Sequence, residues 1–316
     1  MTETMIHMSG VSRLFGGVKA LDSINLEVHR GEVMGFLGPN GAGKTTTMRI
    51  LSGLLAPSEG SVAVAGVDVL ENPVEARARI GFLPENPPIY GEMTVREYLN
   101  YLATLRRVPG AKLKAAVDRA MERCGLTTVT DRLLRNLSKG FRQRAGIAQA
   151  IVHGPDVVVL DEPTVGLDPI QIREIRALIR ELGGEHSVLL STHILPEVRM
   201  TCQRVAVIHQ GRIVADDTLD ALETRARGKS IHHLRWKNSP TLQTLRQIPG
   251  VADATPSEDG WLITALPESD PVPELVRLSA ASGWDLRELT QAGGSLEEIF
   301  LQLTTREERP EEGEEA

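Results

Sequence analysis

The sequence GPNGAGKT at residues 38–45 constrains the fold more strongly than any other feature of this chain. It matches the pattern GxxxxGK[ST] in full, and it lies between an apolar strand candidate at residues 33–37 and a helix candidate at residues 41–54. Glycines allow the backbone to turn so that several N–H groups point at one anion, and the start of the helix adds partial positive charge. The sequence therefore predicts a P-loop that binds the phosphates of a nucleotide.

The residues of this loop are candidates for distinct contacts with ATP. Lys44 is expected to reach the β- and γ-phosphates, and the hydroxyl of Thr45 is expected to bind Mg²⁺. The other candidates supply backbone N–H groups or line the loop, and they are Gly38, Pro39, Asn40, Gly41, Ala42, Gly43 and Thr46.

A second motif, VVVLDEP at residues 157–163, is an apolar strand candidate that ends in two adjacent carboxylates. Alone it could be a solvated strand end, but beside a P-loop the catalytic interpretation is favoured. Asp161 is then expected to hold Mg²⁺ directly or through water. Glu162 is expected to orient the attacking water and to deprotonate it as a general base.

Strand candidates that alternate with helix candidates predict an α/β fold with a largely parallel sheet. A block at about residues 86–155 has helical spacing, so we expect a helical subdomain inserted between strands. After about residue 227 the pattern resets to the β-α-β-β-α-β order of ferredoxin-like domains. We expect an ATPase domain at residues 1–227, an α+β accessory domain at residues 228–305 with a closing helix at residues 295–303, and a disordered acidic tail at residues 306–316.

Three further motifs carry a resemblance to a known family. LSKGFRQR at residues 137–144 resembles the LSGGQ signature of the ATP-binding subunits of ABC transporters, VGLD at residues 165–168 resembles their D-loop, and STH at residues 191–193 resembles their switch region. With the two motifs above, the resemblance extends over roughly residues 5–220. It implies an ABC ATPase domain with an antiparallel β subdomain and a helical insert.

The resemblance also implies a role for each motif. Two ATPase subunits would pack head to tail, as a homodimer, so that each ATP lies between the P-loop of one chain and the signature of the other. From the partner chain, Ser138 and the backbone of Gly140 would contact the γ-phosphate, and Lys139 would either face solvent or add positive charge near the nucleotide. Phe15 would stack on the adenine, and Asp168 would couple the two sites across the interface. His193 would hold the γ-phosphate and the catalytic geometry around Glu162.

The sequence departs from the family pattern in two places. Lys139 and Phe141 stand in the signature where the family often has Gly and Gln. Glu85, in the segment GFLPENPPIY, stands where the family usually has the glutamine of the Q-loop. A glutamate can still bind Mg²⁺ or a water, although as a charge rather than as a neutral amide, so Glu85 remains a metal candidate.

The charge of the chain argues against nucleic-acid binding, and its hydropathy argues against a membrane-spanning helix. The formal net charge is −7, and six of the last ten residues are glutamates, so the rest of the chain gives no electrostatic reason to expect nucleic-acid binding. The chain has no apolar stretch of the roughly 20 residues that a membrane-spanning helix needs, and its start does not resemble a signal peptide. Cys124 and Cys202 are too far apart to suggest a metal site.

Within the family, the segment PENPPIYGEMTVREYL from Pro84 resembles exporters whose permease is a separate integral-membrane chain. This resemblance implies a cytoplasmic ATPase subunit held on the inner face of the cell membrane by its permease, whose cytoplasmic helix docks near residues 85–98. The alternative is a soluble ABC ATPase of the DNA-repair or translation type. That class needs coiled coils, zinc-binding insertions or two ATPase domains in one chain, and none of these is visible in the sequence.

Overall fold

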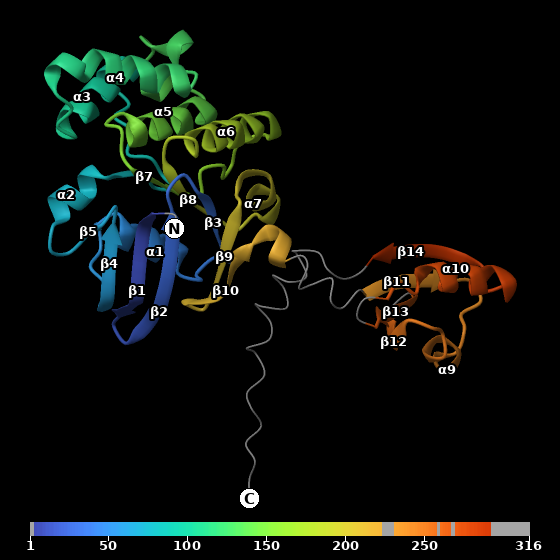
Figure 1. The fold of residues 1–316 in the computed structure, drawn as a ribbon. Helices are drawn as coiled ribbons and strands as arrows, with labels where there is room; N and C mark the ends of the chain where they lie inside the picture. The colour runs from blue at the N-terminus through green and yellow to red at the C-terminus, as the bar shows by residue number, and fades with distance from the viewer. Residues whose placement is uncertain (1–2, 223–230, 258–259, 267–268, 292–316) are drawn as a thin grey trace, which may run out of the picture. The chain divides into compact units, whose positions relative to one another are not determined.

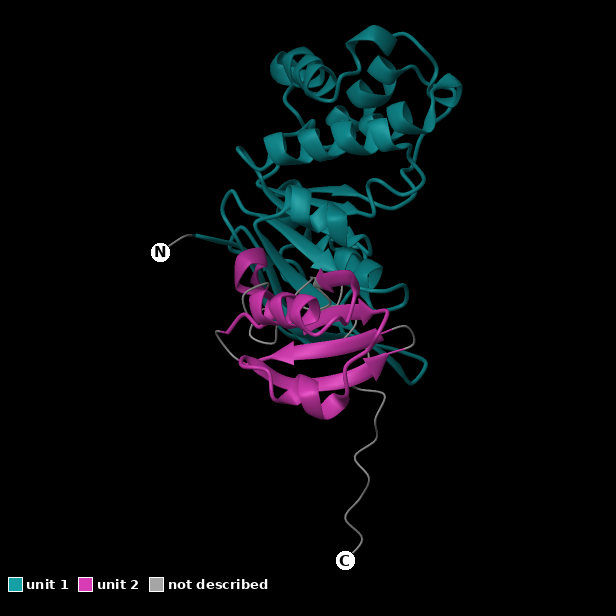
Figure 2. Ribbon diagram, turned by 90° about the vertical axis from the view of Figure 1, so that its right-hand side faces the viewer, with its two compact units in different colours: residues 1–216 teal, residues 217–316 magenta. Residues whose placement is uncertain are grey.

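The computed structural model describes residues 3–222, 231–257, 260–266 and 269–291. The chain forms two compact units, Met1–Asp216 and Asp217–Ala316, which Figure 2 shows in different colours. The domain boundary expected at residue 227, the closing helix expected at residues 295–303 and the acidic tail expected at residues 306–316 all lie outside the described residues.

The first unit is built on a six-stranded sheet with the strand order β10-β9-β3-β8-β7-β6 (Figure 1). The four neighbouring pairs from β9 to β6 are all parallel, which confirms the predicted parallel sheet. Every residue of β3, β7 and β8 is buried, as expected for strands that are covered on both faces. The strands are β3 (Val33–Leu37), β6 (Ile80–Leu83), β7 (Val157–Asp161), β8 (Ser187–Thr192), β9 (Arg204–His209) and β10 (Arg212–Thr218).

A second, antiparallel sheet has the order β2-β1-β4-β5 and comprises β1 (Thr4–Phe15), β2 (Val18–His29), β4 (Glu59–Val64) and β5 (Val67–Asp68). The helix α1 (Lys44–Leu51) packs against strands of both sheets. Its buried side chains Met48, Ile50 and Leu51 join one hydrophobic core with residues from both sheets. Because α1 follows the P-loop directly, this packing fixes the loop at the junction of the two sheets.

The predicted helical insertion lies between β6 and β7 and contains α3 (Val95–Leu105), α4 (Gly110–Arg123) and α5 (Lys139–Ile151), which Figure 1 shows in green. Thr94 starts α3 with a capping box, in which Thr94 and Glu97 satisfy each other's backbone N–H groups. The other helices of this unit are α2 (Pro73–Ala78), α6 (Pro169–Leu182) and α7 (Leu195–Thr201), and short 3₁₀ turns lie at Thr127–Val129 and Leu134–Asn136.

The second unit has the predicted β-α-β-β-α-β order. Its sheet runs β12-β13-β11-β14, and all neighbouring strands are antiparallel. The Trp236 indole donates to Ser279 Oγ at 2.7 Å and meets the ring of Trp284 edge-on, so Trp236 lies in the core of this unit and Trp284 packs against that core. The elements are β11 (Ile231–Trp236), α9 (Leu242–Arg246), β12 (Val251–Ser257), β13 (Gly260–Ala265), α10 (Val272–Ala281) and β14 (Leu286–Gln291).

Candidate active site

The P-loop connects the end of β3 to the start of α1, in the strand-loop-helix context that the motif requires. Gly38 and Gly43 show why this loop needs glycine. A Cβ on Gly38 would lie 2.5 Å from the backbone oxygen of Ile208, and Gly43 has a φ of +111°, which side chains disfavour. The loop therefore depends on its glycines to pass close to β9 and to enter the helix.

Lys44 is buried and folds back over the loop. Its ammonium donates to the backbone oxygens of Gly38 at 2.8 Å and Pro39 at 3.1 Å, and it lies 3.4 Å from Glu162 Oε1. The cation is thus held inside the curve of the loop, where it faces the carboxylate at the end of β7. A phosphate that entered the loop would meet this ammonium together with the backbone N–H groups.

Glu162 and His193 follow the neighbouring strands β7 and β8, and their side chains meet. The Nδ1 atom of His193 lies 3.0 Å from each carboxylate oxygen of Glu162, and the Glu162 backbone N–H donates to Ser191 O. Glu162 has a φ of +49°, the left-handed region that a non-glycine residue enters at a cost. The structure thus brings together the predicted base and the predicted switch histidine, in a backbone conformation that is typical of functional sites.

Asp161, the last residue of β7, is almost fully buried, and no hydrogen bond of standard geometry reaches either of its carboxylate oxygens from the described residues. Burial raises the pKa of Asp161, the nearby hydroxyls of Ser191 and Thr45 lower it in part, and the negative charges of Glu162 and Glu85 raise it further. Two buried carboxylate oxygens beside the Thr45 hydroxyl are an arrangement that a hard divalent cation would stabilise.

The described residues contain no group of three or more His, Cys, Asp or Glu side chains that is arranged to hold a metal ion by itself. This agrees with the coordination of Mg²⁺ in nucleotide sites, where one or two protein oxygens act together with phosphate oxygens and waters. Thr45, Asp161 and Glu85 therefore fit a Mg²⁺ that arrives with a nucleotide better than they fit a permanent metal centre.

Lys44, Glu162 and His193 line a cavity of about 390 Å³, which we refer to as the nucleotide cavity. It lies beyond the carboxyl ends of β3, β7 and β8, the usual ligand-binding edge of a parallel sheet. Glu85, from the segment after β6, lines it beside Lys44 and Glu162. The remaining lining residues are Ala20, Asn40, Gly41, Gly43, Thr45, Thr46 and Val165.

The other half of the predicted site lies elsewhere in the chain. None of Ser138, Lys139 and Gly140, at the start of α5, lines the nucleotide cavity. Ser138 caps α5 by accepting from Phe141 N, and Asp168 caps α6 by accepting from the N–H groups of Ile170 and Gln171. Ser138, Lys139 and Asp168 are exposed, whereas Gly140 is buried beside the Gln171 side chain.

Lys139 does not simply extend into solvent. Its ammonium lies so close to Gly166 that a Cβ atom on Gly166 would be only 2.1 Å from the Lys139 nitrogen. Lys139 and Arg142 also line a second cavity, of about 280 Å³, together with Glu85. Glu85 and Lys139, two of the residues that depart from the family pattern, thus carry opposite charges and line one shared cavity.

Phe15 ends β1 with an exposed ring and does not line the nucleotide cavity. The Arg13 guanidinium lies 4.7 Å from the centre of this ring. An exposed ring is available for stacking, but the residues described here do not enclose an adenine pocket around it.

Sequence reasoning missed one buried carboxylate beside the site, Glu197 in α7. Its carboxylate is 1% exposed and accepts hydrogen bonds from the hydroxyls of Thr164 and Thr192. The available signal was a glutamate four residues after His193 in the otherwise apolar sequence ILPEV.

Comparisons with known proteins agree with this geometry. The family model described as ABC transporter matches residues 21–165. The chain is 35% identical over 302 residues to the bacitracin transport ATP-binding protein BcrA of Bacillus licheniformis, across 95% of this chain and 97% of that protein. It is 34% identical over 316 residues to the daunorubicin resistance ATP-binding protein DrrA3 of Streptomyces coeruleorubidus, across 99% of each.

Solved structures show the same fold. A structure of an ATP-binding subunit of an ABC transporter has a TM-score of 0.64 and 29% identity, over 70% of this chain and 93% of that chain. A dimeric, post-hydrolysis structure of the ATP-binding cassette MJ0796 with ADP and phosphate has a TM-score of 0.61 over 68% of this chain and 99% of that chain. At 24% identity, the second likeness establishes the fold alone.

Proposed function

Because this chain belongs to the family of ABC transporter ATP-binding subunits, whose members hydrolyse ATP, we propose that it dimerises on ATP and thereby drives a separate membrane permease for export. Export is supported by the names of its relatives, one a bacitracin transport protein and another a daunorubicin resistance protein, which match over nearly the whole length of this chain. The finding that carries the proposal is the incomplete site. The P-loop residues Lys44 and Thr45 meet Glu162 and His193 at one cavity, while the signature at residues 138–140 lies outside it.

In the proposed reaction, a water molecule attacks the γ-phosphorus of ATP and the bond to the β–γ bridging oxygen breaks. Glu162 accepts the proton of the attacking water, and His193 holds Glu162 and the γ-phosphate in line. Lys44 leaves its carbonyl partners and stabilises charge on the phosphate oxygens. Mg²⁺, held by Thr45 and Asp161 with Glu85 directly or through water, would neutralise phosphate charge.

The signature of a second copy would complete this site. Ser138 is exposed at the start of α5, where its hydroxyl and the partial positive charge of the helix N-terminus would suit the γ-phosphate of the partner's nucleotide. Asp168, at the start of α6, would lie at the same interface. A dimer thus places two ATP molecules between two chains, and hydrolysis would separate the chains again.

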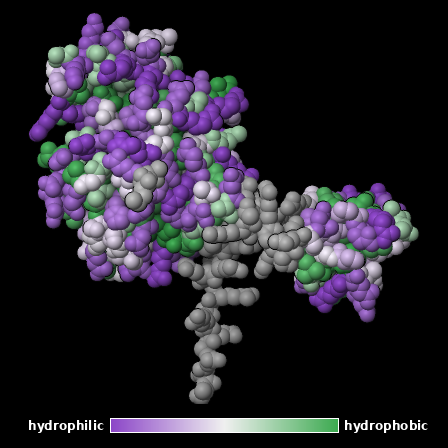
Figure 3. All heavy atoms as spheres, viewed as in Figure 1, coloured by the Kyte–Doolittle hydropathy of each residue, from purple (hydrophilic) through white to green (hydrophobic). Residues whose placement is uncertain are grey.

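The surface that would meet the permease lies on the first unit, on and beside α3. Tyr90, Tyr101 and Leu105 are each more than 40% exposed, and the rings of Tyr90 and Tyr101 meet edge-on with centres 5.7 Å apart. Leu105 also lines a groove of about 880 Å³, together with Val74 of α2. Figure 3 shows mainly hydrophilic surface on the first unit, with apolar atoms at the edge where α2 lies. Exposed aromatic side chains of this kind are typical anchors of protein interfaces.

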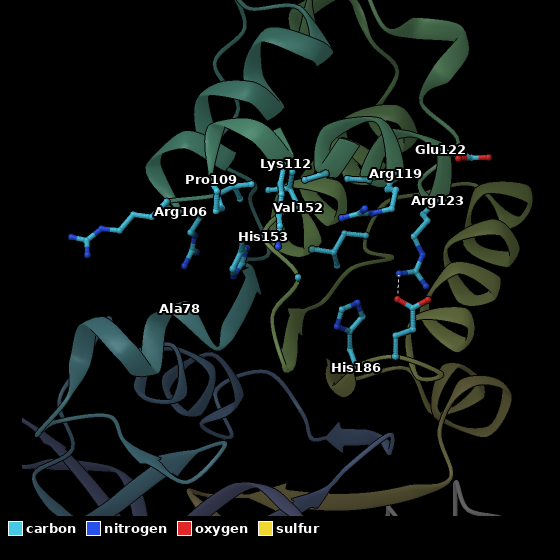
Figure 4. Close-up of a pocket in the computed structure, with 17 residues that line it drawn as sticks. Ala78, Arg106, Pro109, Lys112, Arg119, Glu122, Arg123, Val152, His153 and His186 are labelled. Carbon is cyan, nitrogen blue, oxygen red and sulfur yellow. Dashed lines mark hydrogen bonds and ion pairs between the residues drawn. The ribbon is translucent and has the colours of Figure 1, made fainter. Parts of the chain in front are cut away.

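A basic cavity of about 620 Å³ adjoins this groove, between the helical insert and the core (Figure 4). Among the described residues, Arg107, Lys112 and Arg119 line it without an ion pair, whereas Arg123 is paired with Glu185. Together the groove and the cavity suit a cytoplasmic helix of a permease that has apolar side chains and carboxylates. Among the residues that the structure describes, no helix is long and apolar enough to cross a membrane.

The experiment that tests this proposal measures recovery of the full-length chain with membranes. The wild-type chain is expected to sediment with membranes of its own cells and not with protein-free lipid vesicles. The combined change Tyr101→Ser and Leu105→Ser should release it, because both side chains belong to the proposed permease face. Val276→Ser, which removes an exposed apolar side chain of the second unit, is the matched control. Equal recovery of the wild type and the double variant would refute the docking face, and wild-type binding to bare vesicles would refute a permease partner.

A further inference from the structure

Glu197 is a buried carboxylate that belongs to none of the recognised motifs. It lies in α7 with 1% of its surface exposed, and a buried charge is costly unless several groups stabilise it. Three groups do so. The hydroxyl of Thr192 donates to it at 2.8 Å, the hydroxyl of Thr164 donates to the other oxygen, and the Arg176 guanidinium lies 3.7 Å away.

Each of the two threonines stands next to a proposed catalytic residue. Thr192 is the last residue of β8 and precedes His193, while Thr164 follows Glu162 by two residues. The two oxygens of Glu197 therefore bind one segment that carries the histidine and one that carries the base. Arg176 comes from a third element, α6, which follows the D-loop.

Thr192 also connects this cluster to the P-loop. Its backbone oxygen accepts from Gly38 N at 3.3 Å, and its hydroxyl accepts from Ile194 N at 3.0 Å. A displaced Thr192 would thus change the backbone on both sides of His193 and at the first residue of the P-loop. Glu197 itself does not line the nucleotide cavity, so it acts on the reaction only through its partners.

We propose that Glu197 is a positioning residue for ATP hydrolysis, which holds Glu162 and His193 at their mutual distance by anchoring Thr164 and Thr192. This inference rests on the proposed roles of Glu162 and His193. The carboxylate accepts one hydrogen bond from each of the two threonine hydroxyls. An amide has a single acceptor oxygen, so a glutamine in this place could accept from only one of them in the same way. The charge and shape of Glu197 are therefore both needed.

The test compares ATP hydrolysis by the full-length chain with Glu197→Gln and Thr164→Val, each alone and together with His193→Ala. We expect Glu197→Gln to lower kcat roughly tenfold or more while KM for ATP and Tm change little, because small displacements of catalytic groups are costly. Thr164→Val removes one donor without touching Glu197, and we expect it to lower kcat in the same direction. Glu181→Gln, which changes an exposed glutamate near the end of α6, is the matched control and should leave kcat unchanged.

The combination with His193→Ala separates positioning from general stability. If Glu197 acts through the histidine and the base, Glu197→Gln should cause little further loss once His193 is gone. The inference would be overturned if Glu197→Gln left kcat unchanged, or if it lowered kcat by the same factor with and without His193. It would also be overturned if Glu197→Gln and Thr164→Val both lowered kcat and both lowered Tm by the same amount. Failure of the proposed function would look different, because Glu162→Gln would then also hydrolyse ATP normally.

Discussion

The Nδ1 atom of His193 lies 3.0 Å from both carboxylate oxygens of Glu162, although the two residues follow different strands of the sheet. On its other side, the same carboxylate faces the ammonium of Lys44 at 3.4 Å. Glu162 is therefore held between an imidazole and a cation at the mouth of the nucleotide cavity. Its φ of +49° shows that the local backbone accepts strain to place it there.

From this arrangement we predict the effect of Glu162→Gln. The amide keeps the shape of the side chain but cannot accept the proton of the attacking water, so kcat should fall by roughly 10²- to 10⁴-fold. Binding of ATP should persist, because Lys44, Thr45 and the loop are unchanged. Steady-state hydrolysis and equilibrium binding of a fluorescent ATP analogue measure the two effects separately.

The same variant should accumulate as an ATP-bound dimer, which sedimentation with and without ATP detects. Glu181→Gln changes an exposed glutamate of α6 and is the control. Hydrolysis by Glu162→Gln at a rate close to that of the wild type would mean that another group takes the proton.

We predict a pH dependence of stability from His153, which lines the basic cavity. Burial lowers the pKa of His153 to about 4, with a smaller contribution from the charge of Arg106. In the unfolded chain the pKa is about 6.5, so the native state favours the neutral ring. The free energy of unfolding should therefore fall as the pH drops from about 6.5 to about 4, by up to about 3 kcal/mol from this residue.

His153→Gln removes this titration and can keep a donor toward Ile80 O, which His153 Nε2 now approaches at 3.2 Å. Urea unfolding of the wild type and the variant between pH 4 and 7 should show a shallower pH dependence for the variant. A variant whose stability follows pH as steeply as the wild type would show that His153 is charged in the native state.

We further predict that Glu85 and Lys139 compensate each other. Both line the cavity of about 280 Å³, and Glu85 also reaches the nucleotide cavity. Glu85→Gln leaves Lys139 and Arg142 without an opposing charge, and Lys139→Gly leaves Glu85 unbalanced near Asp161. Each single variant should alter KM for MgATP more than the double variant does, with a coupling free energy of about 1 kcal/mol.

A double-mutant cycle on KM measures this coupling. The same cycle with Lys114→Gln, a change on the exposed face of α4, provides the additive reference. Strictly additive effects of Glu85→Gln and Lys139→Gly would contradict the compensation.

Much of the site could be predicted from the sequence because its motifs are local. Lys44 and Thr45 follow glycines whose spacing dictates the loop, and Asp161 and Glu162 end a strand whose four preceding residues are all apolar. The central strands were predictable for the same reason, since continuous apolar runs of about five residues fit a sheet that is covered on both faces.

The features that could not be predicted depend on partners far away in the sequence. Four of the seven residues of β10 are polar. Ion pairs join this strand to β9, through Asp216 and Arg204, and to β2, through Arg212 and Asp22. The helix α2 has only six residues and little apolar character. The burial of Glu197 arises only when β7, β8 and α6 come together, and no local pattern distinguishes it from a surface glutamate.

The central claim is that each ATP site combines the P-loop of one chain with the signature of another. It is tested most directly by mixing two inactive variants, Lys44→Ala and the exposed signature change Ser138→Arg, and measuring ATP hydrolysis. In a mixed dimer both defects fall in one site and the second site is intact, so the account predicts that activity returns on mixing. Mixing Lys44→Ala with Glu162→Gln should restore nothing, because both defects lie in the P-loop half. If the first mixture stays as inactive as its components, the composite site, and with it this account of the protein, is contradicted.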